Sequence, residues 1–183
     1  EEAIRNLIDV FYDAGKLSLE LRSKGLTEQI KKDKTPVTNG DIEVNNIILN
    51  NLKKITPHVP IVSEETAENK NLNLETFWLV DPIDGTYDYI NNGDEFTLNA
   101  GLIINKEAIA GIIYAPAKNR MFYSYGNKLS YELKNGKEEI INNKKIDKNN
   151  IKAVSYSNNL KAEIIEIHKK LNVKEYVKMK SSL

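Results

Sequence analysis

The sequence has 183 residues, which is enough for one domain or for one domain and part of a second. Hydrophobic residues make up 40% and charged residues 28%, a composition typical of a globular chain. It contains no cysteine, which excludes disulfide scaffolds, cysteine-ligated metal centres and thiol catalysis. The 26 basic and 26 acidic residues cancel, so the net charge neither favours nor opposes a polyanionic partner.

Two amphipathic helices are expected at the start of the chain. Apolar residues recur at helical spacing over residues 4–17, and Gly25 is a suitable stop for this first helix. The polar residues 31–36 indicate a loop or an edge strand. A second helix is expected to begin at Thr38, because Thr38 and Asp41 have the spacing of a capping box.

The apolar pattern then changes to short runs that are typical of strands. Strands are predicted at residues 59–62, 77–80, 96–104, 108–114, 121–125, 128–133 and 138–141. A turn cluster is predicted at residues 81–86 and a hairpin at Asn135-Gly136. A strand, a helix and a strand follow at residues 152–157, 160–171 and 173–179. This order predicts an α+β fold, with an N-terminal metal- and phosphate-binding domain in residues 1–146 and the start of an α/β domain in residues 147–183.

The densest group of chemical side chains is in residues 81–86, which read DPIDGT after the apolar run 77–80. Two carboxylates three residues apart on a turn can converge on one point, and Mg²⁺ prefers oxygen ligands. A helix opened by Gly85 and Thr86 would also offer free N–H groups to a phosphate. The structural alternative is an Asx-type turn, in which Asp81 and Asp84 only accept hydrogen bonds from the backbone.

Two further segments carry charged residues in informative positions. Residues 62–65 read VSEE, so a carboxylate follows a strand and can reach a site at the end of a neighbouring strand. The alternative is a pair of ordinary loop acids. In residues 32–41, Asp41 can serve the helix dipole and the cap alone, and Lys32 and Lys34 can belong to a solvated loop.

Together these segments carry a family pattern. The ordered motifs KxDxTPVTxxD, VSEE and WLVDPIDGT resemble the inositol monophosphatase superfamily of Mg²⁺-dependent, lithium-sensitive phosphatases. Residues 93–99 (GDEFTLN) and 111–117 (GIIYAPA) resemble its CysQ-type 3'(2'),5'-bisphosphate nucleotidases, as does the closing KSSL of residues 180–183. The resemblance implies a layered α/β/α/β/α sugar-phosphatase-type fold. The N-terminal helices and antiparallel sheet would be complete and the C-terminal α/β layer truncated.

The resemblance also implies roles for individual residues. It assigns metal binding to Glu64, Asp81, the backbone carbonyl of Ile83, and Asp84. It assigns the orientation and activation of the attacking water to Asp41 and Thr86. It assigns binding of the substrate phosphate to Asp84, Gly85, Thr86 and Tyr87.

Two departures from the subgroup pattern bear on these roles. The bisphosphate nucleotidases usually have a lysine where this chain has Tyr87, which leaves the exact substrate open. The family's C-terminal WDxxA motif, which supplies another metal-binding aspartate, is not in the sequence. The chain also starts without methionine and ends within what reads as an element. We therefore expect a fragment that folds poorly or binds Mg²⁺ weakly at its second site.

The leading hypothesis is hydrolysis of the 3'-phosphate of 3'-phosphoadenosine 5'-phosphate to AMP and phosphate, by water activated at two or three Mg²⁺ ions and with inhibition by lithium. The alternatives are an inositol monophosphatase or sugar phosphatase, and an inactive truncated metal-binding fragment. Nucleic-acid binding through the basic second half is disfavoured, because its lysines do not alternate with aromatic residues in a known motif.

The expected partner is therefore a small phosphorylated molecule. The sequence has no apolar stretch long enough for a transmembrane segment and no signal-peptide pattern. Cytoplasmic location is the default expectation, and the resemblance allows peripheral association with the inner face of a membrane.

Overall fold

The computed structural model describes residues 1–31, 34–66, 73–126, 129–141, 147–155 and 159–179. Its contacts divide the chain into two compact units, Glu1–Ile141 and Asn142–Leu183. The domain boundary expected at residues 146 and 147 adjoins residues 142–146, which lie outside the described residues, so that boundary stays a prediction.

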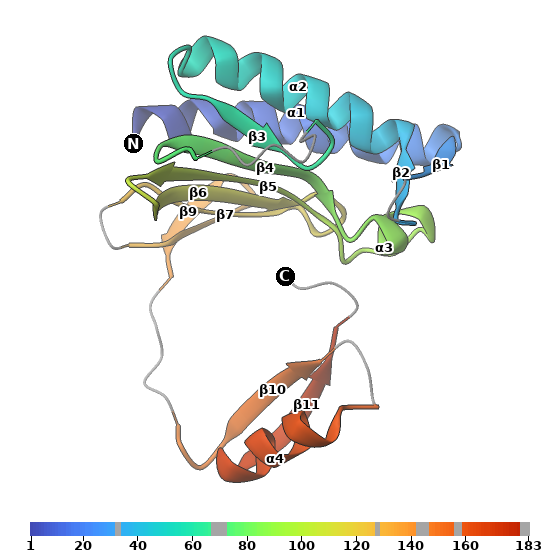
Figure 1. Ribbon diagram of the computed structural model, residues 1–183, viewed down its shortest axis with the longest axis vertical. Coiled ribbons are helices and arrows are strands. Elements are labelled where there is room, and N and C mark those ends of the chain that lie inside the picture. Colours follow the sequence, from blue (N-terminus) through green and yellow to red (C-terminus); the bar gives the residue numbers. More distant parts are fainter. Residues whose placement is uncertain (32–33, 67–72, 127–128, 142–146, 156–158, 180–183) are drawn as a thin grey trace. The chain divides into compact units, whose positions relative to one another are not determined.

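The first unit has two helices on one face of a seven-stranded sheet (Figure 1). The helices are α1 (Glu2–Lys24) and α2 (Asn39–Ile55). The sheet order is β3 (Ile61–Ser63), β4 (Phe77–Asp84), β5 (Thr97–Ile104), β6 (Glu107–Ala115), β7 (Arg120–Ser124), β8 (Tyr131–Lys134) and β9 (Lys137–Ile140). β3 and β4 are parallel and every later pair is antiparallel. This mixed arrangement confirms the predicted α+β class.

Smaller elements complete the first unit. β1 (Glu28–Ile30) and β2 (Pro36–Thr38) form a separate antiparallel pair in the segment of the chain that connects α1 to α2. A short helix, α3 (Thr86–Ile90), follows β4, and a 3₁₀ turn (Pro116–Lys118) follows β6. The predicted hairpin at Asn135-Gly136 is confirmed, because both residues have positive φ angles, 51° and 73°, and connect β8 to β9.

The ends of the two long helices follow the sequence signals. Gly25, with φ of 99°, ends α1 as predicted, because this backbone conformation is unfavourable for other residues. Thr38 caps α2: its hydroxyl accepts hydrogen bonds from the backbone N–H groups of Gly40 and Asp41, and the Asp41 side chain accepts one from the Thr38 N–H. The predicted capping box is therefore confirmed.

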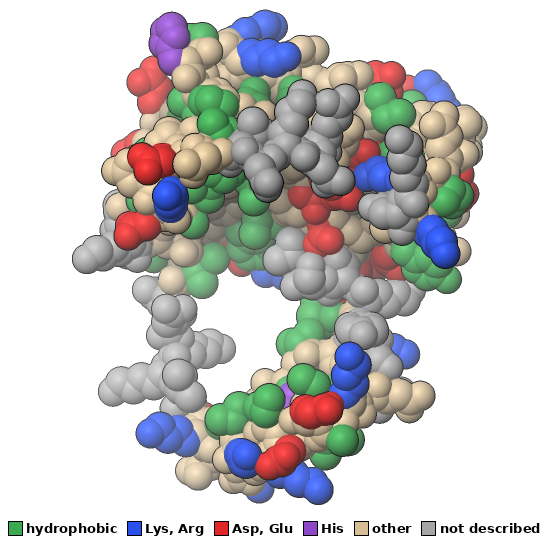
Figure 2. Space-filling model, viewed as in Figure 1, with side chains coloured by type: hydrophobic (Ala, Val, Ile, Leu, Met, Phe, Trp, Pro, Cys, Tyr) green, Lys and Arg blue, Asp and Glu red, His purple; other side chains and the backbone are tan. Residues whose placement is uncertain are grey.

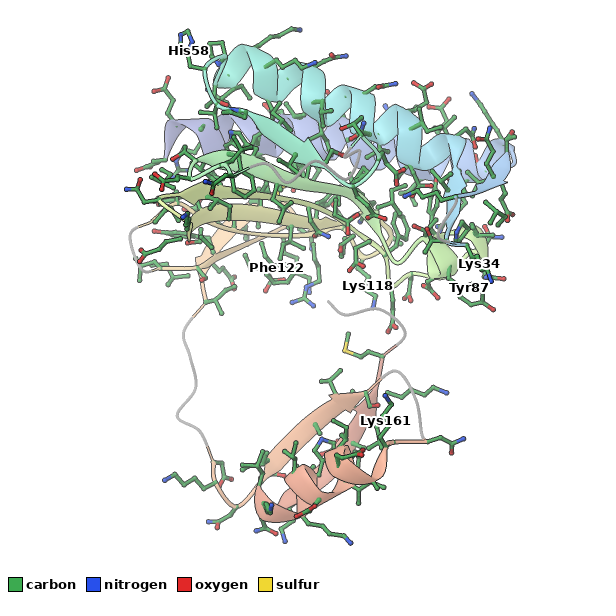
Figure 3. The ribbon with its side chains drawn as sticks, in the orientation of Figure 1. Lys34, His58, Tyr87, Lys118, Phe122 and Lys161 are labelled. Carbon is green, nitrogen blue, oxygen red and sulfur yellow. The ribbon has the colours of Figure 1, made fainter. Side chains whose placement is uncertain are left out.

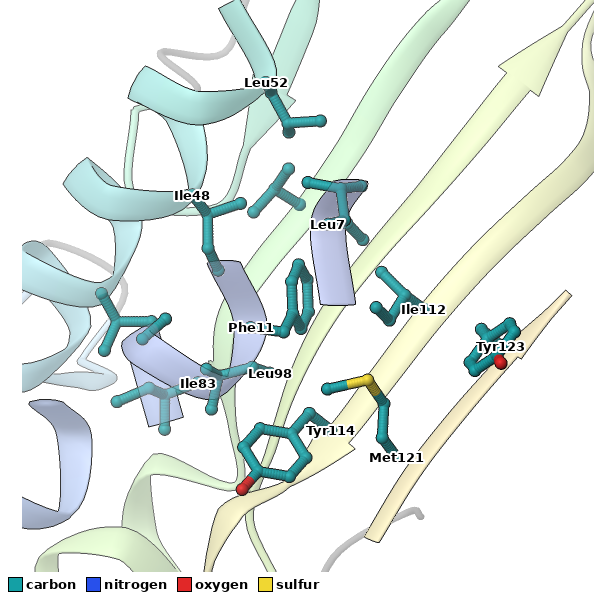
Figure 4. Close-up of a cluster of buried hydrophobic side chains, with 14 of the residues drawn as sticks. Leu7, Phe11, Ile48, Leu52, Ile83, Leu98, Ile112, Tyr114, Met121 and Tyr123 are labelled. Carbon is teal, nitrogen blue, oxygen red and sulfur yellow. The ribbon is translucent and has the colours of Figure 1, made fainter. Parts of the chain in front are cut away.

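The hydrophobic core of the first unit fills the space between the helices and the sheet (Figure 4). Phe11 of α1 and Ile48 of α2 are fully buried against Leu98, Ile112 and Met121 from three successive strands. Burial of each large side chain contributes about 1.5–3 kcal/mol, so this layer is what holds the sheet in place.

The structure corrects one predicted element. β4 continues through Asp84, so residues 81–84 lie in a strand and not in the predicted turn cluster. The pairing of β4 with β5 is shifted between Asp81 and Asp84, which is the irregularity of a β-bulge. The turn itself is confined to Gly85, whose left-handed conformation leads into α3.

The second unit is a strand–helix–strand segment, as predicted. β10 (Ile151–Ser155) and β11 (Val173–Lys178) are parallel neighbours, and α4 (Ala162–Lys170) connects them. Residues 180–183, which carry the KSSL resemblance, lie outside the described residues. Within the described ranges, no helix has the length and hydropathy needed to cross a bilayer.

Close packing of α1 on the sheet leads to the first prediction. A Cβ at Gly15 would overlap the ring of Tyr114, although alanine is normally the better helix former. We expect Gly15→Ala to lower the free energy of unfolding by about 1–3 kcal/mol. The control is Lys16→Ala at the neighbouring exposed position, which should change stability by about 0.5 kcal/mol or less. Equal urea midpoints for the two variants would contradict this account of the packing.

Candidate metal and phosphate site

The bulge in β4 places two carboxylates on the same face of the sheet. Asp81 pairs with Asn99 of β5 and Asp84 pairs with Thr97, so four residues of β4 lie opposite three of β5. In a regular strand, residues three apart point to opposite faces. The extra residue cancels this alternation, while Ile83 turns into the core, where it is 2% exposed. The predicted convergence of Asp81 and Asp84 thus comes from a bulged strand.

β3 brings a third carboxylate to the same place. The backbone N–H of Glu64 donates to the carbonyl of Val80 at 3.0 Å, which sets Glu64 beside the position where Asp81 begins the bulge. Burial raises the pKa of Asp81 to about 7, and the negative charges of Glu64 and Asp84 add to this effect. The pairing of β3 with β4 and the bulge in β4 thus place Glu64, Asp81 and Asp84 at the same end of the sheet.

The oxygen atoms of this region suit a hard cation. Asp81 Oδ1 is buried and has no hydrogen-bond partner among the described residues, so it is available to a cation or to a water molecule. Carboxylates and a backbone carbonyl are the ligands that Mg²⁺ prefers. Within the described ranges, however, no three acidic or histidine side chains are already arranged as a metal-binding group. These residues fit a cation in the type of ligand atom that they offer.

Asp41 and Thr86, predicted as a catalytic pair, are in contact. Asp41 is fully buried, and its Oδ2 accepts hydrogen bonds from the Thr38 N–H at 2.7 Å and the Thr38 hydroxyl at 2.6 Å. The Thr86 hydroxyl lies 3.2 Å from Asp41 Oδ1 and 3.1 Å from the carbonyl oxygen of Ile83. Burial raises the pKa of Asp41, and the hydrogen bonds from Thr38 and Thr86 oppose that rise. Asp41 therefore both caps α2 and contacts Thr86.

The residues after the bulge, for which phosphate binding is predicted, turn at Gly85 into α3. Gly85 has φ of 85°, and its carbonyl accepts the Tyr89 N–H at 3.0 Å as α3 begins. Tyr87 is 77% exposed and points away from the first unit (Figure 3). His58 lies at the opposite end of this unit. The structure thus leaves Tyr87 at the edge of the site, and its role in substrate binding stays a prediction.

Lys31 is a site residue to which the sequence assigns no role. Its ammonium lies 3.2 Å from Glu64 Oε1 and 2.9 Å from Glu65 Oε1, and Glu65 is only 9% exposed. The sequence contains a signal that could have identified this residue, because Lys31 is the first residue of the KxDxTPVTxxD motif. Lys32 and Asp33 lie outside the described residues. Lys31 directly follows β1, so its ion pairs with Glu64 and Glu65 connect the β1–β2 pair to the carboxylates after β3.

The raised pKa of Asp81 predicts a pH dependence of stability in the absence of divalent cations. Folded Asp81 keeps its proton up to about pH 7, whereas its ordinary pKa is 3.8, so the folded state binds more protons between these values. Stability from this group therefore falls as the pH rises through that range. Asp81→Asn should raise the melting temperature more at about pH 8 than at about pH 5, measured by circular dichroism in EDTA. The same shift at both pH values would refute this assignment.

Comparisons with known proteins agree with these features. The sequence model of the Inositol monophosphatase family matches residues 1–182. The 3'(2'),5'-bisphosphate nucleotidase CysQ of Buchnera aphidicola is 38% identical over 121 residues, or 65% of this chain and 46% of that protein. CysQ of Escherichia coli K12 is 40% identical over 94 residues, or 50% of this chain and 38% of that protein. The matched part of the chain thus spans less than half the length of each of these two relatives.

A solved structure shows the same fold. The crystal structure of CysQ from Bacteroides thetaiotaomicron, a bacterial member of the inositol monophosphatase family, has a TM-score of 0.75. The match covers 94% of this chain and 70% of that one at 24% identity, which confirms the layered fold. Since the family model matches residues 1–182, the chain belongs to the inositol monophosphatase family.

Proposed function

We propose that this chain is part of a Mg²⁺-dependent phosphatase that removes the 3'-phosphate of 3'-phosphoadenosine 5'-phosphate. The observation that carries the proposal is the contact of Thr86 with buried Asp41, next to the region shared by three carboxylates. Hydrolysis of a phosphate ester needs a held water molecule and compensation of negative charge, and these two groups of residues suit those two needs.

The metal-binding part of the proposal rests on Glu64, Asp81, Asp84 and the carbonyl of Ile83. When bound, Mg²⁺ would neutralise the phosphate and lower the pKa of a coordinated water. The family is generally Mg²⁺-dependent, which supports this choice of ion. The presence of two or three ions and inhibition by lithium stay predictions from the resemblance.

Asp41 and Thr86 would orient the attacking water. The two hydrogen bonds from Thr38 hold the Asp41 carboxylate, so Oδ1 is turned towards the Thr86 hydroxyl. A hydroxyl that donates its proton to Asp41 can accept one from water with its free lone pairs. Thr38 is then a positioning residue, because it fixes the carboxylate that fixes the threonine.

The choice of a nucleotide substrate rests on the relatives and on local sequence. Both curated relatives are named bisphosphate nucleotidases, and the GDEFTLN segment leads into β5 beside Asp84. Gly85 and Thr86 would bind the phosphate through the start of α3. The bisphosphate nucleotidases usually have a lysine at the position of Tyr87. Because this chain differs there, an inositol or sugar phosphate is the alternative substrate.

Nucleic-acid binding through the basic second half of the chain finds less support. In the second unit, Lys152 forms an ion pair with Glu175 and Lys170 forms one with Glu166. The visible face of this unit also mixes hydrophobic and acidic side chains with the lysines (Figure 2). This is not the continuous basic surface that nucleic-acid binding uses.

Activity assays decide between this proposal and the alternative of an inactive fragment. The cytoplasmic location and the peripheral membrane association stay predictions.

The direct test is phosphate release from 3'-phosphoadenosine 5'-phosphate and from inositol 1-phosphate, with and without Mg²⁺. We expect Mg²⁺-dependent release from the nucleotide, lost in Asp84→Asn and kept in Asp13→Asn, which makes the same change on the exposed face of α1. Preference for inositol 1-phosphate would select the alternative substrate. Release from neither substrate would contradict the proposed activity for this chain.

The role of Thr86 has a test of its own. Thr86→Val keeps the shape of the side chain but removes the hydroxyl that contacts Asp41. We expect a fall in kcat of about 100-fold or more, because positioned acid–base groups contribute about 10²–10⁴-fold. KM should change little, and Thr86→Ser should restore most of the rate. A fall in affinity with kcat unchanged would show that the Thr86 hydroxyl binds the substrate and does not orient the water.

A further inference from the structure

Three buried polar atoms without a partner lie together on β4 and β5. Within the described ranges, the buried side-chain atoms that make no hydrogen bond are Asp81 Oδ1, Thr97 Oγ1, Asn99 Oδ1 and, in the second unit, His168 Nδ1. Asn99 is the cross-strand neighbour of Asp81, and Thr97 is that of Asp84. Because cross-strand neighbours share a face, three of the four atoms line one short stretch of this two-strand ladder.

The chemistry of these atoms excludes mutual pairing of the carboxylate and the amide oxygen. Once Asp81 is ionised, as it must be to hold a cation, its carboxylate and the amide oxygen of Asn99 are both acceptors only, so neither can satisfy the other. Thr97 is 3% exposed, and its hydroxyl can accept as well as donate. Buried polar groups in native proteins are nearly always hydrogen-bonded, so this stretch needs something that brings hydrogen-bond donors. Water molecules, alone or around a cation, meet that need.

We propose that Thr97 and Asn99 are positioning residues that accept hydrogen bonds from water molecules of a hydrated divalent cation held at Asp81 and Asp84. The inference rests on the proposed function and extends its site from β4 to the neighbouring strand. Mg²⁺ keeps several of its waters when a protein binds it, so acceptors beyond the direct ligands are needed. Thr97 and Asn99 act through those waters and not on the cation itself.

The type of residue suits this role. Glu64, Asp81 and Asp84 already bring three carboxylates into one partly buried region, where a further negative charge would be unfavourable. A neutral amide and a hydroxyl add acceptors without adding charge. Their place on β5 is fixed by the ladder with β4 and by Leu98, which lies between them and is fully buried in the core.

Binding of Mn²⁺, followed by the EPR signal of the free ion, tests this inference without an activity assay, and competition by Mg²⁺ confirms the site. We expect Thr97→Val and Asn99→Leu each to weaken Mn²⁺ binding by about 10-fold, as outer-shell substitutions do. Thr97→Ser should restore binding. The metal-free melting temperature of Thr97→Val should not rise, because in the wild type water already satisfies the hydroxyl.

The matched control is Thr56→Val. Thr56 is a hydrogen-bonded threonine whose hydroxyl accepts the Trp78 Nε1–H at 2.9 Å. This variant should melt at a lower temperature yet bind Mn²⁺ within about twofold of the wild type, which separates lost stability from lost positioning.

Two results would overturn the inference, and only the second would also contradict the metal site of the proposed function. If the wild type binds Mn²⁺, and Thr97→Val and Asn99→Leu bind it equally well and melt at higher temperatures, then Thr97 and Asn99 are merely unpaired polar groups. The proposed function would survive that result. If the wild type itself binds neither Mn²⁺ nor Mg²⁺, the metal site of the proposed function fails together with the inference.

Discussion

One extra residue in β4 is the feature on which the site depends. The β-bulge between Asp81 and Asp84 lets both carboxylates face the same side of the sheet, while Ile83 between them packs into the core. A regular strand would send one of the two carboxylates into the hydrophobic layer, where an unpaired charge is strongly unfavourable. The core thus holds the bulge in place, and the bulge provides the geometry for chemistry. Gly85 then releases the strand into α3.

The second constraint is that the atoms of Thr38 and Asp41 that begin α2 are the same atoms that the proposed chemistry would use. Their reciprocal hydrogen bonds begin α2, a contribution of about 1 kcal/mol for a typical helix cap. The same bonds turn the free oxygen of Asp41 towards Thr86. A substitution at Thr38 would therefore disturb both the helix and the orientation of the buried carboxylate, and measurements at this position report on both.

The sequence predicted what depends on neighbouring residues. The stop of α1 at Gly25, the capping box at Thr38 and the hairpin at Asn135-Gly136 are local signals, and each is confirmed. The predicted path of residues 81–84 was wrong, because proline and aspartate are typical of turns, whereas strand register depends on β5. Lys31 was missed for a similar reason, since its ion pair with Glu64 joins residues 33 positions apart. The site residues came from the family motifs, and only the fold shows that these motifs meet.

The central claim is that the bulge gathers carboxylates to hold a divalent cation. Anomalous diffraction from crystals of this chain grown with Mn²⁺ tests it most directly. The account predicts a Mn²⁺ peak in contact with Asp81 and Asp84, with both side chains on the same face of the sheet. An ordered β4 whose two aspartates point to opposite faces, or a saturated crystal with no ion beside them, would contradict it.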